Sequence, residues 1–315
     1  DMAFRITVAF WIRRAWRLLP SAWTWLALTL VAVVLFNQSG VFGGFRTNLE
    51  ATVAGVLQVA NLRFAETFGR SEYGASFVYW TLSLEEQFYL ILPLLVLVSR
   101  RFLPYVLIAI VVYQLFSTRT LMTVVFRTDA IALGVLLALW SMHSTYAIAR
   151  PVFLSRIKWA GTLAMLGLVL CMGILGSEVL HVVSGRFSWF AVLSLLLVWI
   201  ASYDMNVLTP ARPLKRLMLW IGSRSYAIYL IHIPAFFLAR EIWFRLRPGV
   251  TPGDEMFYPL LLTAAALLIV FSELNFRLIE TPLRLRGSRI AKRFLTGMPE
   301  NVLSEERAKT SVAGQ

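Results

Sequence analysis

The chain has 315 residues, of which 58% are hydrophobic and 15% are charged, and its mean hydropathy is +0.70. A soluble domain averages about 45–50% apolar and about 25% charged residues, so this composition excludes an ordinary soluble globular protein. The formal net charge of +13 is spread over several short segments between apolar runs. Nucleic-acid binding would instead gather the charge in one stripe, and we predict no nucleic-acid partner.

The apolar runs recur along the chain with short polar gaps, and most approach the length of about 20 residues that a helix needs to cross a bilayer. We therefore predict an all-α fold, a polytopic transmembrane helical bundle of about eight spans. It forms a single membrane domain over residues 1–285, followed by a basic and polar tail over residues 286–315. The shorter stretch 50–64 is predicted to be an interfacial or re-entrant helix. The predicted spans are 18–36, 80–99, 102–117, 121–141, 157–175, 187–203, 218–240 and 257–277.

The arginines and lysines orient these spans. When alternate inter-span segments are assigned to the cytoplasm together with both ends of the chain, most of the 30 basic residues fall on that side. This positive-inside bias predicts that both termini of this chain are cytoplasmic. The basic stretch 284–293 is expected to form an interfacial helix attracted to anionic membrane lipid.

The single cysteine, Cys171, has no partner in the chain for a disulfide. The sequence has no C-x-x-C pair and no histidine-rich cluster, so we predict no metal site and no bound cofactor. The chain opens on Asp1 rather than methionine and has no signal peptide, so we expect further sequence upstream.

Polar side chains in or beside the apolar runs are the candidates for function, because charge inside a bilayer is costly and usually has a task. In FWIRRAWRLLP, Arg14 and Arg17 share a helix face at spacing i, i+3. A pair of guanidinium groups can fork onto a phosphate or a carboxylate. The alternative is that these arginines only anchor the helix at the cytoplasmic interface.

Two adjacent carboxylates begin the run SLEEQFYLILP. On a helix, Glu85 and Tyr89 share a face at spacing i, i+4, while Glu86 points about 100° away. We therefore expect Glu85 to face the protein interior and Glu86 to lie at the interface or in an ion pair. The alternative is that both carboxylates are solvated at the helix N-terminus, where its dipole favours them.

The run FRTDAIALG carries Arg127 and Asp129 into an apolar span. Two residues apart on a helix, they would point in different directions, which favours separate partners over a mutual pair. An ion pair that joins Asp129 or Glu85 to an arginine of another segment is the structural alternative.

The run IGSRSYAIYLIHIPAFFLAR places Ser225, Tyr229 and His232 at spacing i, i+4 and i+7, as one polar stripe on an apolar helix. Pro234 frees the carbonyl of Leu230, which predicts a kink beside His232. The histidine is a candidate catalyst, and the alternative is a hydrogen-bonded packing residue.

The order RRAWRLLP, WTLSLEEQFYLILP, FRTDAIALG, IGSRSYAIYLIHIP and LNFRLIETPLR, from about Phe10 to Arg286, resembles the acyltransferase family 3 membrane proteins, which O-acylate sugars of bacterial envelopes. The resemblance implies a ten-helix domain of the bacterial inner (cytoplasmic) membrane. It would take an acyl group, commonly acetyl, from cytoplasmic acyl-CoA and deliver it to a polysaccharide or other carbohydrate hydroxyl. The family's proposed catalytic histidine lies on the first helix, so eight spans here and two before Asp1 would complete the ten.

The family's motif residues carry over position by position. They fall on Arg14, Arg17, Glu85, Gln87, Phe88, Tyr89, Arg127, Asp129, Ser225, Tyr226, Tyr229, His232, Pro234, Glu280 and Pro282.

Acyl transfer to a hydroxyl needs a base, donors for the oxyanion and a site for the CoA phosphates. We hypothesise that Arg14 and Arg17 hold those phosphates and that Glu85 orients the acceptor. His232 is the substitute on this chain for the upstream histidine. Two other functions stay open, a non-catalytic membrane subunit of a larger complex and a transporter. The residues expected to bind substrate are Arg14, Arg17, Tyr89, Arg127, Asp129, Ser225, Tyr226 and Tyr229.

Overall fold

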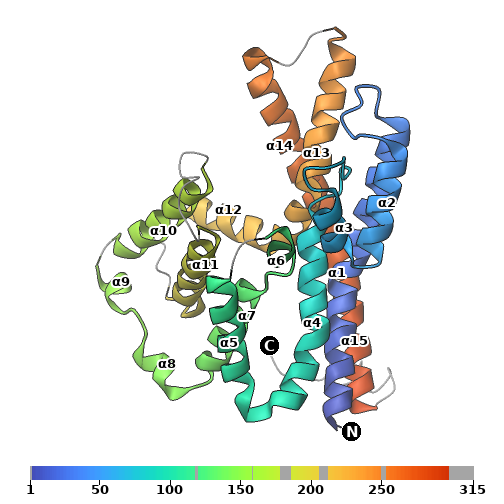
Figure 1. Ribbon diagram of the computed structural model, residues 1–315. Coiled ribbons are helices and arrows are strands. Elements are labelled where there is room, and N and C mark those ends of the chain that lie inside the picture. The colour runs from blue at the N-terminus through green and yellow to red at the C-terminus, as the bar shows by residue number, and fades with distance from the viewer. Residues whose placement is uncertain are drawn as a thin grey trace, which may run out of the picture. The chain divides into compact units, whose positions relative to one another are not determined.

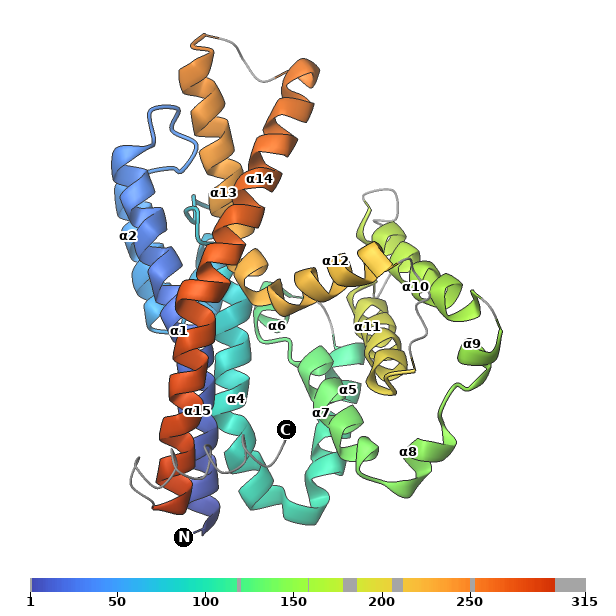
Figure 2. The same ribbon diagram turned by 180° about the vertical axis from the view of Figure 1, so that it is seen from behind.

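The computed structural model describes residues 2–117, 120–157, 159–177, 186–205, 212–249 and 253–297 (Figures 1 and 2). Every regular element in these ranges is helical, which confirms the predicted all-α fold. The chain separates into two compact units. Unit 1 comprises Asp1–Pro93 and Ser223–Gln315, and unit 2 comprises Leu94–Gly222. The predicted tail after residue 297, like the basic residues Arg119 and Lys158, lies outside the described residues.

Unit 1 is organised around the 34-residue helix α1 (Met2–Leu35). Helix α15 (Thr281–Thr296) lies beside the N-terminal half of α1 in both views (Figures 1 and 2). The helices approach most tightly at Gly287, where an added Cβ would lie 2.2 Å from the Cβ of Trp16. Only glycine allows this approach, since any side chain would displace the tryptophan.

Helix α14 (Phe257–Asn275) continues into α15 through a π-helical turn, Phe276–Glu280. Such turns hold more residues per turn than an α-helix and are frequent at functional sites. The end of α14 contacts α1 through Trp25, whose Nε1 donates to Asn275 Oδ1 over 3.1 Å. The π-helical turn therefore lies between the contact of α14 with Trp25 of α1 and the contact of α15 with the N-terminal half of α1.

The core of unit 1 forms where α1, α13 (Ser225–Leu246) and the beginning of α4 (Tyr79–Ser99) meet. The Tyr79 hydroxyl donates to the carbonyl of Ala22 over 2.8 Å. Small and branched apolar side chains fill the contact, which brings the three backbones close together. The buried residues include Ala22, Leu26, Val78, Ala227, Leu230 and Ile231.

The stretch 50–64, predicted as one helix, belongs instead to two short helices, α2 (Phe45–Val56) and α3 (Ala60–Thr67). The break falls at Gln58, whose φ of 58° is left-handed and ends a right-handed helix. Helix α2 packs against α1.

Unit 2 contains the remaining helices, of which α5, α7 and α11 pack together. In order they are η1 (Arg100–Phe102), α5 (Leu103–Phe116), α6 (Leu121–Val125), α7 (Asp129–Ser141), α8 (Ser144–Ile148), α9 (Phe153–Arg156), α10 (Ala160–Gly176), α11 (Arg186–Ser202) and α12 (Arg212–Ser223).

Within the described ranges, five helical segments are long and apolar enough to cross a membrane, and a sixth is possible if the bent pair Ser144–Arg156 and Ala160–Gly176 forms one span. A polytopic helical membrane protein is thus confirmed, whereas the number eight stays a prediction. The predicted span 218–240 is wrong in its beginning, because α12 ends at Ser223 and α13 starts anew at Ser225. The five segments are Met2–Leu35, Tyr79–Phe116, Leu121–Ser141, Ser225–Leu246 and Phe257–Thr296.

Candidate active site

Arg14 of α1 bridges the two adjacent carboxylates of α4. Its Nε donates to Glu86 Oε1 over 3.1 Å, and its Nη2 lies 3.7 Å from Glu85 Oε2. The side chains of Arg14 and Glu86 are each 19% exposed, whereas that of Glu85 is 47% exposed. The expectation that Glu85 is the inward residue is therefore wrong, whereas the expected ion pair of Glu86 is confirmed. Helical spacing does separate the two glutamates, but a long, forked guanidinium spans the gap and encloses Glu86 more completely.

The ring of Tyr89 lies under the same guanidinium. The Cζ atom of Arg14 is 3.2 Å from the ring centroid. Trp11 of α1 donates from its indole nitrogen to the carbonyl of Tyr89 over 3.3 Å. Arg14 thus contacts Glu85, Glu86 and Tyr89 together, and stacking on an aromatic ring adds attraction for the cation.

Helix α3 holds the first turns of α4 in place. Asn61, which is fully buried, and Gln87 exchange two amide hydrogen bonds of 3.0 Å. Gln87 also donates to the carbonyl of Gln58 over 2.8 Å. A buried amide pair of this kind is well satisfied and fixes the rotation of α4, which positions the glutamates. No local pattern in the sequence indicates Asn61, because its partner Gln87 lies 26 residues away.

The polar stripe of α13 is only partly assembled as predicted. The hydroxyl of Tyr226 donates to the Leu18 carbonyl of α1 over 2.8 Å. The hydroxyl of Tyr229 donates to the Val78 carbonyl over 3.0 Å and also contacts Thr81 Oγ1. Ser225, the first residue of the helix, is exposed. The two tyrosines therefore join α13 to α1 and to the α4 segment, and Ser225 does not share their contacts.

His232 is hydrogen-bonded within its own helix. Its Nδ1 lies 2.7 Å from the carbonyl of Tyr229. Because a carbonyl can only accept, Nδ1 carries the proton in this bond. Pro234 follows two residues later inside the helix. This arrangement agrees with the packing role that the sequence left open for His232.

Glu280 ends the π-helical turn and is only 4% exposed. Its carboxylate interacts electrostatically with the guanidinium groups of Arg284, Arg17 and Arg224. In the described part of the chain, its Oε2 has no hydrogen-bond partner. The predicted site residue Arg17 thus has a buried carboxylate in its surroundings. Glu280 stood in the quoted sequence motif, but nothing in the spacing of that motif indicated burial.

Unit 2 holds the other predicted pair. Arg127 donates from Nε to Asp129 Oδ1 and from Nη2 to Asp129 Oδ2, both over 2.7 Å, and Asp129 is 1% exposed. The expectation of separate partners is wrong, because Arg127 precedes α7 and has non-helical backbone, so helical spacing does not apply to it. Gln114 supports the segment by accepting from the Thr128 amide over 2.8 Å.

The arrangement in unit 1 can bind an anion or a polar group at its more open edge. Glu86 occupies the Nε edge of Arg14, while Glu85 holds the Nη2 edge loosely. A phosphate or a second carboxylate could replace Glu85 there with a forked contact. Among the residues that the structure describes, no three His, Cys, Asp or Glu side chains come together as metal ligands.

Comparison with known proteins identifies relatives over most of the chain. The peptidoglycan O-acetyltransferase OatA of Listeria monocytogenes is 27% identical over 303 residues, which is 88% of this chain and 46% of that protein. The Bacillus subtilis protein named "Putative peptidoglycan O-acetyltransferase YrhL" is 27% identical over 309 residues, 89% of this chain and 46% of that protein. No solved structure matches. The chain spans about half the length of these relatives. The acyltransferase domain family matches residues 2–272, and the chain therefore belongs to the acyltransferase 3 family.

Proposed function

We propose that this chain is the membrane domain of an O-acyltransferase that moves an acetyl group from acetyl-CoA to a carbohydrate hydroxyl. The observation that carries the proposal is the Arg14–Glu86–Glu85 cluster stacked on Tyr89, enclosed by helices of a chain that belongs to the acyltransferase 3 family. The names of the relatives, which are peptidoglycan O-acetyltransferases, support acetyl as the group and a sugar as the acceptor.

In this proposal the donor phosphates bind to the basic half of unit 1. The N-terminal half of α1 and helix α15 lie side by side, and neither has an acidic residue in its first turn. Arg17 and the Nη2 edge of Arg14 contact the phosphates, with charge-assisted hydrogen bonds. The positive-inside bias supports a cytoplasmic position for this half and therefore a cytoplasmic donor. The basic residues of the paired helices are Arg5, Arg13, Arg14, Arg17, Arg284, Arg286, Arg289, Lys292 and Arg293.

The carboxylate of Glu85 orients the acceptor in this scheme. It is the more exposed of the two glutamates and is held by a single loose contact of 3.7 Å. It can therefore accept a hydrogen bond from an acceptor hydroxyl while Glu86 keeps Arg14 in place. The hydroxyl oxygen then forms the new ester bond to the acyl carbon, the thioester C–S bond breaks, and CoA leaves as its thiol after taking up the displaced proton.

The experiment is a transfer assay with the purified protein in liposomes. Radiolabelled acetyl-CoA and a soluble peptidoglycan disaccharide are supplied, and base-labile acetyl ester on the sugar is counted. Transfer by the wild-type protein, at least tenfold weaker in Arg14→Ala and in Arg17→Ala, supports the proposal. The matched control is Arg13→Ala, because Arg13 is exposed like Arg17 and adjoins Arg14 in the sequence but takes no part in the contacts of Glu85, Glu86 or Glu280. Absence of ester formation by the wild-type protein, or equal loss in the control, would overturn the proposal.

A further inference from the structure

The loop between α3 and α4 forms one wall of a small pocket in unit 1. The pocket has a volume of about 290 Å³. Its wall contains aromatic rings from four segments: Phe42 of the α1–α2 loop, Phe64 and Phe68 of α3 and its C-cap, Tyr73 and Phe77 of the α3–α4 loop, and Phe237 of α13. Its polar groups come from the loop and from the end of α3.

Two open polar groups stand beside these rings. Glu72 and Ser71 are exposed, and the structure gives neither side chain a hydrogen bond or an ion pair. Thr67 lines the same space with its hydroxyl, which donates to the carbonyl of Arg63 over 2.9 Å and keeps its lone pairs for another donor. The pocket thus offers a carboxylate and two hydroxyl groups across from aromatic faces.

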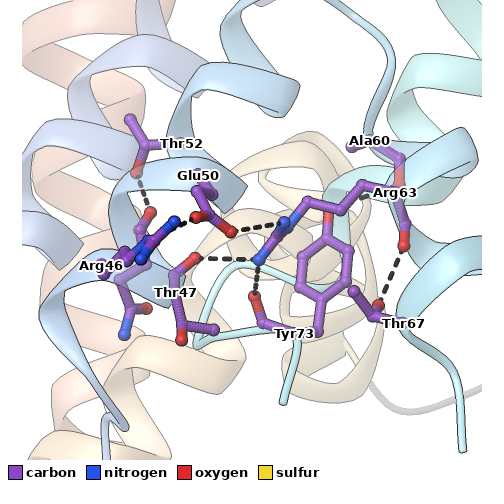
Figure 3. Close-up of polar contacts among 9 residues, drawn as sticks. Arg46, Thr47, Glu50, Thr52, Ala60, Arg63, Thr67 and Tyr73 are labelled. Carbon is purple, nitrogen blue, oxygen red and sulfur yellow. Dashed lines mark hydrogen bonds and ion pairs between the residues drawn. The ribbon is translucent and has the colours of Figure 1, made fainter. Parts of the chain in front are cut away.

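The loop that carries these groups is fixed by its neighbours. Figure 3 shows Arg63 between α2 and the loop: its Nη1 donates to Glu50 Oε2 over 3.0 Å, and its Nη2 lies 3.4 Å from the carbonyl of Tyr73. The Tyr73 hydroxyl donates to the carbonyl of Ala60 over 3.3 Å. Burial raises the pKa of Tyr73 above its ordinary value, so the phenol stays a neutral donor.

Two further features of the backbone hold the loop in place. The amide of Ala75 donates to the buried side chain of Asn48 over 2.9 Å. Gly43, which lies beside the exposed side chain of Glu72, has a φ of +78°. This left-handed backbone conformation favours glycine at position 43. The pocket is therefore preformed, which lowers the entropic cost of binding a ligand.

We infer that this pocket binds one sugar ring of the carbohydrate acceptor, an inference that rests on the proposed function. A pyranose ring has apolar C–H faces, which suit aromatic rings, and equatorial hydroxyls, which suit a carboxylate and hydroxyl groups at the edge. Pockets for small ligands combine a mostly apolar wall with a few placed polar groups in the same way. The volume suits a single ring, and a longer chain would extend through the open side.

The location agrees with this assignment. Tyr79 begins α4 directly after the pocket loop, and Glu85 follows six residues later, roughly 9 Å along the helix axis. If one sugar ring is bound at the loop, the next sugar ring of the same oligosaccharide would therefore lie within reach of Glu85. None of the residues that line the pocket lies on the N-terminal half of α1 or on α15, where the donor is proposed to bind.

The test is direct binding of a soluble N-acetylglucosamine tetramer to the purified full chain in detergent, measured by saturation-transfer NMR and calorimetry without any acyl donor. We expect Phe68→Ala and Glu72→Ala to weaken binding at least fivefold. Both side chains are exposed, so their removal should leave the thermal unfolding midpoint unchanged. The matched controls are Phe45→Ala and Glu66→Ala, exposed residues outside the pocket wall, which should bind like the wild type.

The inference is overturned if the wild type does not bind the tetramer, if the pocket variants bind as tightly as the wild type, or if the controls weaken binding equally. The outcome is separable from that of the proposed function, because sugar binding is read without acetyl-CoA. If the protein shows sugar binding that depends on Phe68 and Glu72 but no acetyl transfer, the inference about the pocket stands and the proposed acetyltransferase function is overturned. If the protein shows acetyl transfer but both variants bind the sugar as the wild type does, the proposed function stands and the inference about the pocket is overturned.

Discussion

The guanidinium carbon of Arg14 lies 3.2 Å from the centroid of the Tyr89 ring while the same group holds Glu86 at 3.1 Å. Arginine alone combines a flat face for the ring with a forked edge for the carboxylates. A lysine at position 14 would keep the positive charge but would have neither the flat face nor the forked edge. The residue type at position 14 is therefore expected to matter more than its charge.

We accordingly expect Arg14→Lys to lower kcat/KM for acetyl-CoA more than about tenfold, which corresponds to about 1.4 kcal/mol. Steady-state kinetics in liposomes measures this, with Arg13→Lys as the control at the exposed neighbour. Full activity in Arg14→Lys would show that charge alone suffices.

The two glutamates should respond differently to neutralisation. Glu86→Gln is expected to lower the free energy of unfolding by about 1.5–3 kcal/mol, because it removes the ionised partner of a mostly enclosed hydrogen bond. Glu85→Gln should leave stability nearly unchanged and raise KM for the acceptor, since its contact to Arg14 is longer and its side chain more exposed. Thermal unfolding and acceptor kinetics of the two variants form the comparison, and the reverse ranking in stability would contradict the geometry.

Breaking the pair in unit 2 should be more costly than removing an ordinary arginine. Arg127→Ala leaves the carboxylate of Asp129 buried without its bidentate partner, for which a loss of about 3–5 kcal/mol is expected. Arg150→Ala, an exposed residue of the same unit, is the control. If the double variant Arg127→Ala, Asp129→Ala is no more stable than Arg127→Ala alone, the buried charge is not the source of the loss.

His232 is expected to act as a packing residue of α13. The side-chain amide of His232→Asn can donate a hydrogen bond in place of the ring, so we expect this variant to retain the transfer rate to within about tenfold. Loss of a general base would lower the rate by at least about a hundredfold. The pH profile of kcat provides an independent readout. A disappearance of its acidic limb together with a loss beyond a hundredfold would assign the proton-accepting role to this imidazole.

Acid should weaken the frame of the sugar pocket. Hydrogen bonds from Arg46 and Arg63 lower the pKa of Glu50 below its ordinary value of 4.5. A lowered folded-state pKa stabilises the fold above the unfolded-state value, and this contribution is lost as the pH falls through the folded-state value. The unfolding midpoints of the wild type and Glu50→Gln should therefore differ at pH 7 and converge below about pH 4.5. A difference that persists unchanged to pH 3 would show that the carboxylate charge is not what matters.

Hydrophobic runs in the sequence predicted the helical membrane fold because they mark segments that are apolar and long enough to cross a bilayer. The pairing of side chains was harder to predict, and Arg127 shows why: helical spacing separates it from Asp129 only if both residues are helical, and the backbone before α7 is not. Glu86 illustrates a second limit, since its enclosure depends on Arg14, 72 residues earlier in the chain. The break between α2 and α3 at Gln58 depends on a single left-handed backbone angle, and the pattern of apolar residues does not indicate such an angle.

The π-helical turn between α14 and α15 sets the rotational phase of the two helices. Asn275 and Gly287, which face α1 through Ser21 and Trp16, are 12 residues apart. On an uninterrupted α-helix their directions would differ by roughly 120°, whereas a turn that absorbs one additional residue reduces the difference to about 20°. One long helix can thereby present the same side to α1 along its whole length. Deleting a single residue between Phe276 and Glu280 would leave Asn275 and Gly287 eleven residues apart, a spacing that an uninterrupted α-helix also aligns to about 20°. Inserting one further residue would instead rotate α15 by about 100° and turn Gly287 away from Trp16.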